Sequence, residues 1–227
     1  MNPLKALDSI KNYISTRGYT ISKLVVVTKN RSHEIIQLLY DGGHRDFGEN
    51  KVQEAEKKFP LVKVKMDQPL IRHHIGPFQS GNAKKTILTF DWIQGISSLS
   101  GLKTLIQTSK KLYEKTQKKI YYLIQLNLTE EPTKLGGMTL QEFESSLELN
   151  PELFMPFPFL EWKGFMAMGP SSGDLNLTRK VFKKLREIKE QYYPNAELSM
   201  GMSHDWQIAL EEGATILRIG SAIVGER

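Results

Sequence analysis

The sequence contains no cysteine among its 227 residues. This absence excludes disulfides, thiolate nucleophiles, zinc–thiolate sites and iron–sulfur clusters. It suits a reducing compartment, so we expect a cytoplasmic protein. Hydrophobic residues make up 40% of the chain and charged residues 25%, proportions that are typical of a folded globular protein rather than a disordered one.

Long apolar runs and metal-ligand motifs are also missing. No stretch approaches the ~18 apolar residues that a membrane-spanning helix needs. The first residues, MNPLKALDSIKNYIS, mix charged and apolar side chains, unlike the apolar core of a signal peptide. The five histidines show no H-E-x-x-H or comparable spacing. We therefore expect neither a membrane partner nor a metal site.

The excess of positive charge is small, because 31 basic side chains stand against 25 acidic ones, which gives +6. The densest basic stretch covers residues 110–119, and its lysines do not alternate with aromatic side chains on which bases could stack. A solvated helix face is the favoured interpretation and an anion-binding patch the alternative. We expect no nucleic-acid partner, although a modest positive field favours a phosphorylated ligand.

One pattern recurs along the chain, a short β-branched or aromatic run followed by an amphipathic stretch. The expected strands cover residues 24–27, 44–47, 70–75, 92–96, 120–126, 160–166, 197–200 and 215–219. Eight strand–helix units predict a single-domain (β/α)8 TIM barrel over residues 1–227. An open doubly wound sheet is the alternative, and it is disfavoured because no G-x-G-x-x-G follows the first strand.

In such a barrel the chemistry lies at the C-terminal ends of the strands. Lys29 follows the buried run at 24–27, which places its amine at the mouth. A lysine amine in a partly desolvated site can attack a carbonyl to form a Schiff base. The alternative is a solvated lysine that merely ends a strand.

The last two strands lead into small polar residues. Ser203 is expected to cap the helix that contains Ile208, and Gly220-Ser221 follow the eighth strand. Backbone N–H groups and hydroxyls there predict an anion cradle, although a serine cap and a tight glycine turn are the simpler interpretation. An amine and a phosphate cradle in one barrel suit a phosphorylated aldehyde, for which pyridoxal 5′-phosphate (PLP) is the obvious candidate.

Nearly the whole chain is covered, in order, by six recognisable segments: LVVVTKNRS, DGGHRDFGENKVQEAEKK, HHIGPFQS, IQLNLTEEPTKLGG, KGFMAMGP and LSMGMSHDWQIALEEGATILRIGSAIVGER. In these segments the chain resembles the pyridoxal phosphate homeostasis protein family, a single-domain relative of the N-terminal barrel of alanine racemases. The resemblance implies that Lys29 forms the Schiff base with the cofactor. It also implies that Asn50, in FGEN, lines the cofactor pocket.

The resemblance further implies a phosphate cup made of Ser203, Gly220 and Ser221. Arg218 matches a position near the pyridine nitrogen, which an arginine would keep unprotonated. The alternative for Arg218 is an interior ion pair. Met202 is expected to pack beside the cofactor ring, as are three other methionines: Met166, Met168 and Met200.

Three places depart from the family's pattern. Residues 72–74 read Arg-His-His where the family has Trp-His-Phe, and residues 81–82 read Gly-Asn where it has Asn-Lys. The family's Lys-Ser-Gly segment appears as Lys-Leu-Gly at 134–136. Lys134 is a candidate for a second, weaker PLP site, and a solvated loop lysine is the alternative.

Racemases and decarboxylases that use this barrel carry a second, β-rich domain, which donates a catalytic base across a dimer interface. Here the eight expected units use the whole chain. We therefore expect a monomeric PLP-binding protein without catalytic residues, which stores, buffers or delivers PLP, with PLP-dependent apoenzymes as recipients. The alternatives are a small PLP-dependent amino acid racemase and an aldolase that uses Lys29 directly on a sugar phosphate.

Overall fold

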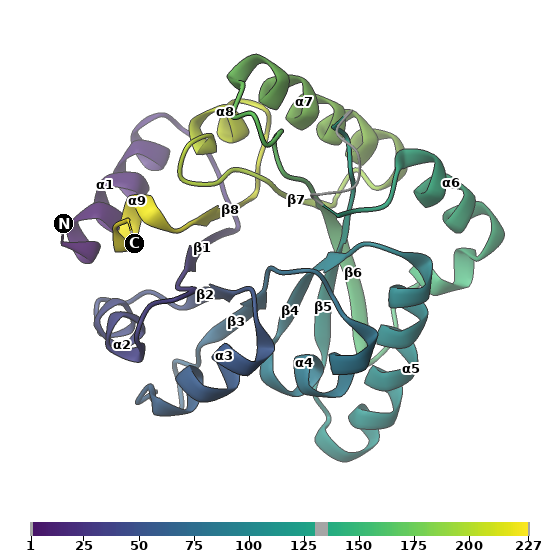
Figure 1. Cartoon of the computed structure of the whole chain (residues 1–227), viewed down its shortest axis with the longest axis horizontal. Coiled ribbons are helices and arrows are strands. Elements are labelled where there is room, and N and C mark those ends of the chain that lie inside the picture. The colour runs from purple at the N-terminus through teal and green to yellow at the C-terminus, as the bar shows by residue number, and fades with distance from the viewer. Residues whose placement is uncertain (1, 130–135, 227) are drawn as a thin grey trace.

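The computed structural model describes residues 2–129 and 136–226. In these residues eight parallel strands close into a barrel in chain order, each paired with the next and the last with the first (Figure 1). The strands are β1 (Lys23–Val27), β2 (Asp46–Glu49), β3 (Ile71–His74), β4 (Trp92–Ile96), β5 (Ile120–Gln125), β6 (Leu160–Met166), β7 (Glu197–Ser199) and β8 (Ile216–Ile219). The expected (β/α)8 barrel is confirmed.

Helices form a ring outside the barrel (Figure 1). They are α1 (Pro3–Thr16), α2 (His33–Asp41), α3 (Val52–Lys58), α4 (Ala83–Thr89), α5 (Leu99–Thr116), α6 (Leu140–Leu149), α7 (Leu175–Tyr192), α8 (Trp206–Glu211) and α9 (Ser221–Val224). The terminal helices α1 and α9 are not among the expected elements, and they pack side by side. Within the described ranges, no helix is both long enough and apolar enough to cross a bilayer.

Strand β2 differs from the expected range, because it begins at Asp46 rather than at residue 44 and ends at Glu49. His44 lies before the strand, and its ring contacts the backbone two residues later, with Nε2 2.8 Å from the Asp46 carbonyl oxygen. Gly48 lies in the strand although glycine is unfavourable there, since a Cβ at this position would lie 2.8 Å from a methyl group of Val25. The close approach of β1 and β2 therefore requires a glycine within β2.

The apolar core has two parts. The larger part lies between the sheet and the surrounding helices. A smaller cluster of buried apolar side chains is separate from it. The smaller cluster consists of Val25, Trp92, Leu123, Met166 and Ile216, one residue from each of five strands. The buried polar side chains on strands β3, β4, β7 and β8 include His73, Gln94, Ser199 and Arg218.

Candidate functional site

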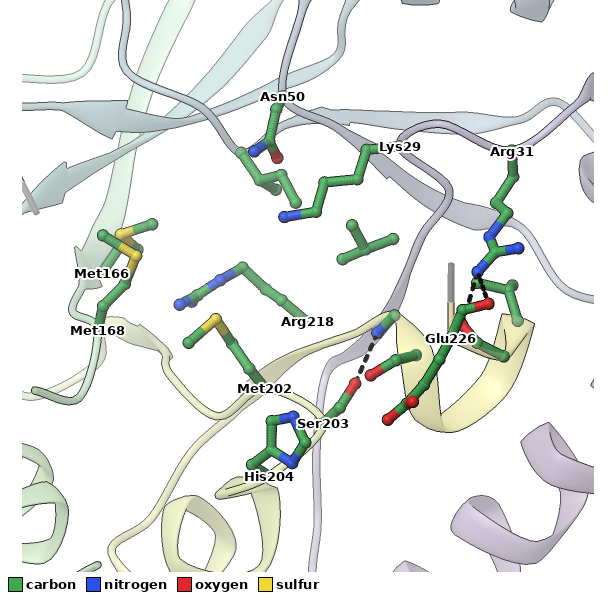
Figure 2. A pocket seen from close by; sticks show the side chains of 16 residues that line it. Lys29, Arg31, Asn50, Met166, Met168, Met202, Ser203, His204, Arg218 and Glu226 are labelled. Carbon is green, nitrogen blue, oxygen red and sulfur yellow. Dashed lines mark hydrogen bonds between the residues drawn. The ribbon is translucent and has the colours of Figure 1, made fainter. Parts of the chain in front are cut away.

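A cavity of about 550 Å³ opens at the C-terminal ends of the strands (Figure 2). Its volume is in the range of small-molecule sites. All seven predicted site residues line it: Lys29, Asn50, Met202, Ser203, Arg218, Gly220 and Ser221. The structure thus brings together residues that are spread over almost two hundred positions of the chain, while their role in binding a cofactor stays a prediction.

Lys29 lies two residues after β1, beyond the buried Thr28. Its side chain is exposed and extends into the cavity, with the amine directed toward the space above Arg218 (Figure 2). The expected position of this amine at the mouth of the barrel is confirmed. A primary amine in this position is accessible to a small carbonyl compound that enters from solvent.

Two side chains of α3, Lys58 and Glu54, hold the loop that carries Lys29, and we call this pair the clamp. Lys58 donates from its amine to the carbonyl oxygens of Thr28 at 2.8 Å and of Arg31 at 2.9 Å, one on each side of the loop. Glu54 accepts a 2.6 Å hydrogen bond from the backbone N–H of Asn30. Asn30 has a φ of 59°, so it stands in the left-handed region that a turn of this kind requires. The clamp fixes the backbone from which the reactive amine projects.

The buried carboxylate of Glu49, at the end of β2, contacts both the Lys58 amine and the loop. Glu49 is fully buried, and its Oε1 atom lies 2.6 Å from the Lys58 amine and accepts a 2.7 Å hydrogen bond from the Thr28 hydroxyl. Its Oε2 atom has no hydrogen-bond partner among the described residues. Burial raises the pKa of Glu49, against the opposing effects of Lys58 and Thr28. None of these supporting residues was predicted, because each acts through a contact that the sequence does not show.

Asn50 follows β2 and is held by a close backbone contact. A Cβ on Gly76, in the loop after β3, would lie 2.3 Å from the carbonyl oxygen of Asn50. Only glycine permits this approach, so the loops after β2 and β3 pack against each other through their backbones. The contact keeps Asn50 at the edge of the cavity.

Ser203 does not cap α8 as expected, because that helix begins at Trp206 with Asp205 as its N-cap residue. The Ser203 hydroxyl instead accepts a hydrogen bond from the N–H group of Gly220 at 3.2 Å (Figure 2) and a second from that of Ala222, also at 3.2 Å. The reason is that the loop after β7 folds over the start of α9 rather than leading straight into α8. Because both N–H groups are directed at its oxygen, the Ser203 hydroxyl can turn its own proton into the cavity, where it is a donor for an anion.

Arg218 is buried, and its guanidinium donates to the Ser199 hydroxyl at 2.6 Å and to the Ala167 carbonyl at 3.1 Å. Burial lowers its pKa to about 10, against the opposing charge of Asp205, so it is a cation at neutral pH. Among the described residues it makes no direct ion pair, and the alternative of an interior ion pair is therefore not supported. The guanidinium lies at the floor of the cavity (Figure 2).

Methionine side chains form one wall of the cavity. Met166, Met168 and Met202 lie together on the side away from Arg31 (Figure 2). Met200 does not line the cavity and is buried in the larger core. Three of the four methionines expected near a bound ring therefore lie where an apolar face is available.

Arg31 is a cavity residue that the sequence analysis missed. Its Nη2 atom donates to the carbonyl oxygens of Gly225 and Glu226, both at 2.7 Å. This contact ties the loop after β1 to the segment after α9 (Figure 2). The second predicted PLP site, Lys134, lies outside the described residues.

Known proteins of similar sequence support the assignment of the fold. The family model described as "Alanine racemase, N-terminal domain" matches residues 5–227. A curated pyridoxal phosphate homeostasis protein from Aquifex aeolicus is 33% identical over 225 residues, which cover 93% of this chain and 90% of that protein.

Two solved structures are informative. PipY from Synechococcus elongatus, with PLP bound, superposes with a TM-score of 0.81 and 29% identity, over 99% of this chain and all of that one. An alanine racemase from Clostridium difficile superposes with a TM-score of 0.74 over 99% of this chain and 59% of the racemase. At 13% identity, the second likeness shows a shared fold alone.

Proposed function

The chain belongs to the pyridoxal phosphate homeostasis protein family, which has the fold of the alanine racemase N-terminal domain, and we propose that it binds PLP through a Schiff base on Lys29. One observation carries this proposal. The Lys29 amine, the Arg218 guanidinium and the small residues Ser203, Gly220 and Ser221 all border a single cavity. Bound PLP in PipY, a structure of the same fold over its whole length, supports it.

The donors present in the cavity fit the groups of PLP. The Ser203 hydroxyl, whose oxygen accepts from the N–H groups of Gly220 and Ala222, can donate its proton to a phosphate, and the loops after the last two strands commonly bind phosphate in this fold. The cationic Arg218 suits a pyridine nitrogen that accepts a hydrogen bond and carries no proton. The methionine wall suits the flat face of an aromatic ring.

PLP supplies an aldehyde, which condenses with a primary amine with loss of water. The protein's part is to present the Lys29 amine from a backbone fixed by Lys58 and Glu54. The remaining groups hold the ring and the phosphate by non-covalent contacts. Such a site retains a reactive aldehyde reversibly, which suits storage, buffering or delivery to PLP-dependent apoenzymes in the cytoplasm.

An amino acid racemase is the second candidate. Racemisation needs two acid–base groups, one on each face of the reacting carbon. Among the described residues that line the cavity, the acid–base side chains besides Lys29 are His204 and Glu226, and both are exposed rather than buried within the site. The lining thus favours a holder of PLP over a racemase. Exchange of the α-hydrogen of alanine with deuterated solvent at ordinary turnover rates would establish the racemase instead.

The proposal is tested by titrating PLP into the purified protein and recording the absorbance. We expect a yellow chromophore in the wild-type protein and its loss in Lys29→Ala. Lys51→Ala is a matched control, since Lys51 is an exposed lysine next to Asn50 that does not line the cavity. A chromophore of undiminished intensity in Lys29→Ala would refute the assignment.

A further inference from the structure

Arg218 is the first member of a hydrogen-bonded chain of five buried or partly buried side chains. Its Nη1 atom donates to the Ser199 hydroxyl at 2.6 Å, and this hydroxyl donates to Gln94 Oε1 at 2.6 Å. The amide nitrogen of Gln94 lies 3.0 Å from His73 Nδ1, and His73 Nε2 lies 3.0 Å from Asp46 Oδ1. The chain connects the cavity floor with a carboxylate at the first residue of β2.

All four hydrogen bonds run in one direction. An arginine can only donate, and an ionised carboxylate can only accept. The acceptor Asp46 requires the proton of His73 on Nε2, which leaves Nδ1 to accept from the Gln94 amide. Burial lowers the pKa of His73, which agrees with a neutral ring. The Gln94 oxygen then accepts from Ser199, and the Ser199 oxygen accepts from Arg218.

The chain crosses the interior of the barrel. Ser199 lies on β7 and Gln94 on β4, strands that are not neighbours in the sheet. His73, Gln94 and Ser199 are fully buried, so water does not compete for these bonds. In such surroundings each bond polarises the next. The end of the chain remote from Arg218 is less buried, since Asp46 is partly exposed. Its carboxylate also lies 3.4 Å from the Lys23 amine.

We propose that Ser199, Gln94, His73 and Asp46 act as a positioning relay, which holds the Arg218 guanidinium toward the ring nitrogen of bound PLP and couples its charge to the Asp46 carboxylate. The inference rests on the proposed function, because the ring nitrogen is that of PLP. Ser199, Gln94 and His73 each turn a lone pair toward Arg218 and a proton away from it, and the Asp46 carboxylate accepts the last proton. The aligned dipoles stabilise the buried guanidinium, which forms no direct ion pair with the described residues.

The relay assigns Gln94 a role that a simple space-filling residue would not have. Gln94 is the central member of the chain, because its oxygen accepts from Ser199 and its amide nitrogen donates to His73, so its removal separates the Arg218 end from the Asp46 end. Gln94→Met preserves the length and shape of the side chain and removes both hydrogen bonds. Leu123→Met is the matched control, because Leu123 is also fully buried on a neighbouring strand and makes no side-chain hydrogen bond.

The test is nitrogen-15 NMR on two nuclei. PLP labelled at the ring nitrogen reports the hydrogen bond that this atom receives, and the side-chain nitrogens of Arg218 report the guanidinium in the protein without PLP. In the labelled complex, Arg218→Met gives the resonance of a ring nitrogen without its partner. We expect Gln94→Met to move the ring resonance from the wild-type value toward that of Arg218→Met, and to move the Arg218 resonances as well. Leu123→Met leaves both at the wild-type values.

Asp46→Asn is a second, milder variant at the partly exposed end. It keeps an acceptor oxygen for His73 and removes the charge, so we expect a smaller movement in the same direction. Wild-type resonances for both nuclei in either folded variant would overturn the relay. Failure of the wild-type protein to bind PLP would refute the proposed function instead, and the Arg218 resonances of the PLP-free protein would still decide for or against the relay.

Discussion

At the scale of single residues, the groups that carry chemistry are easier to predict than the groups that hold them. Lys29 could be predicted because a lysine just beyond a buried strand is conspicuous, and Gly220 because a glycine follows the last strand. Lys58 could not, because a lysine in a helix-forming segment is typical of a solvated surface, and Glu49 could not, because nothing in the sequence marks the glutamate at the end of β2 as buried. Here they meet at 2.6 Å, buried beneath the loop.

Ser203→Ala tests the phosphate end of the cavity. The variant removes the hydroxyl that now accepts from the N–H groups of Gly220 and Ala222. A hydrogen bond to a charged group contributes about 1.5–3 kcal/mol, so we expect the Kd for PLP to rise by roughly 10- to 100-fold. Equilibrium titration followed by absorbance measures the change.

The matched ligand for this variant is pyridoxal, which has the aldehyde and the ring but no phosphate. Its affinity should be almost the same in wild-type protein and Ser203→Ala. An equal loss of affinity for both ligands would mean that Ser203 acts on the shape of the cavity and not on the phosphate.

At the scale of elements, α3 determines the geometry of the site although it contributes no residue to the cavity lining. The helix positions Glu54 and Lys58 one turn apart, where both reach the loop after β1. Their mutual ion pair at 2.8 Å is of the i,i+4 type that helices favour. The position of the Lys29 amine therefore depends on a helix that follows the next strand in the chain.

Lys58→Met tests this dependence. Removal of the amine leaves the buried Glu49 carboxylate without its cation, a change that typically destabilises a protein by about 3–5 kcal/mol. Urea denaturation measures the free energy of unfolding, and PLP titration should show weaker binding because the loop is released. Adding Glu49→Gln should recover much of the lost stability.

Lys57→Met is the control for this experiment, since Lys57 is the exposed neighbour on the same helix. A change at such a surface position typically stays within about 0.5 kcal/mol. Equal stability of the Lys57 and Lys58 variants would show that the buried cluster does not hold the loop.

At the scale of the whole molecule, periodicity and strand count were sufficient to predict a closed barrel. The eight strands could be located within about two residues because buried parallel strands give continuous apolar runs. Helix α9 could not be predicted, since four residues give no periodic pattern. The buried relay could not either, because Ser199 and Gln94 stand 105 positions apart and meet only when the barrel closes.

Two buried histidines predict how the stability of the fold depends on pH. Desolvation lowers the pKa values of His44 and His74 to about 4, from 6.5 in the unfolded chain. As the pH falls below 6.5, the unfolded chain takes up protons that the folded protein does not bind, so unfolding becomes more favourable. We expect the free energy of unfolding to fall by about 1.4 kcal/mol per pH unit for each histidine between pH 6 and pH 4.

Urea denaturation of the PLP-free protein across this range measures the slope. His44→Gln and His74→Gln should each remove a substantial part of it, since each removes one buried imidazole whose pKa is lowered. A free energy of unfolding that stays constant from pH 7 to pH 4.5 would contradict this account of the two rings.

The central claim, that Lys29 is the covalent attachment point for PLP, is tested most directly by trapping with borohydride. The protein is loaded with PLP, reduced with sodium borohydride, digested and analysed by mass spectrometry. The account predicts a stable phosphopyridoxyl group on the peptide that contains Lys29, at about one group per chain, and none on that peptide without PLP. A modification found mainly on another lysine, or no stable modification after reduction of a yellow protein, would contradict it.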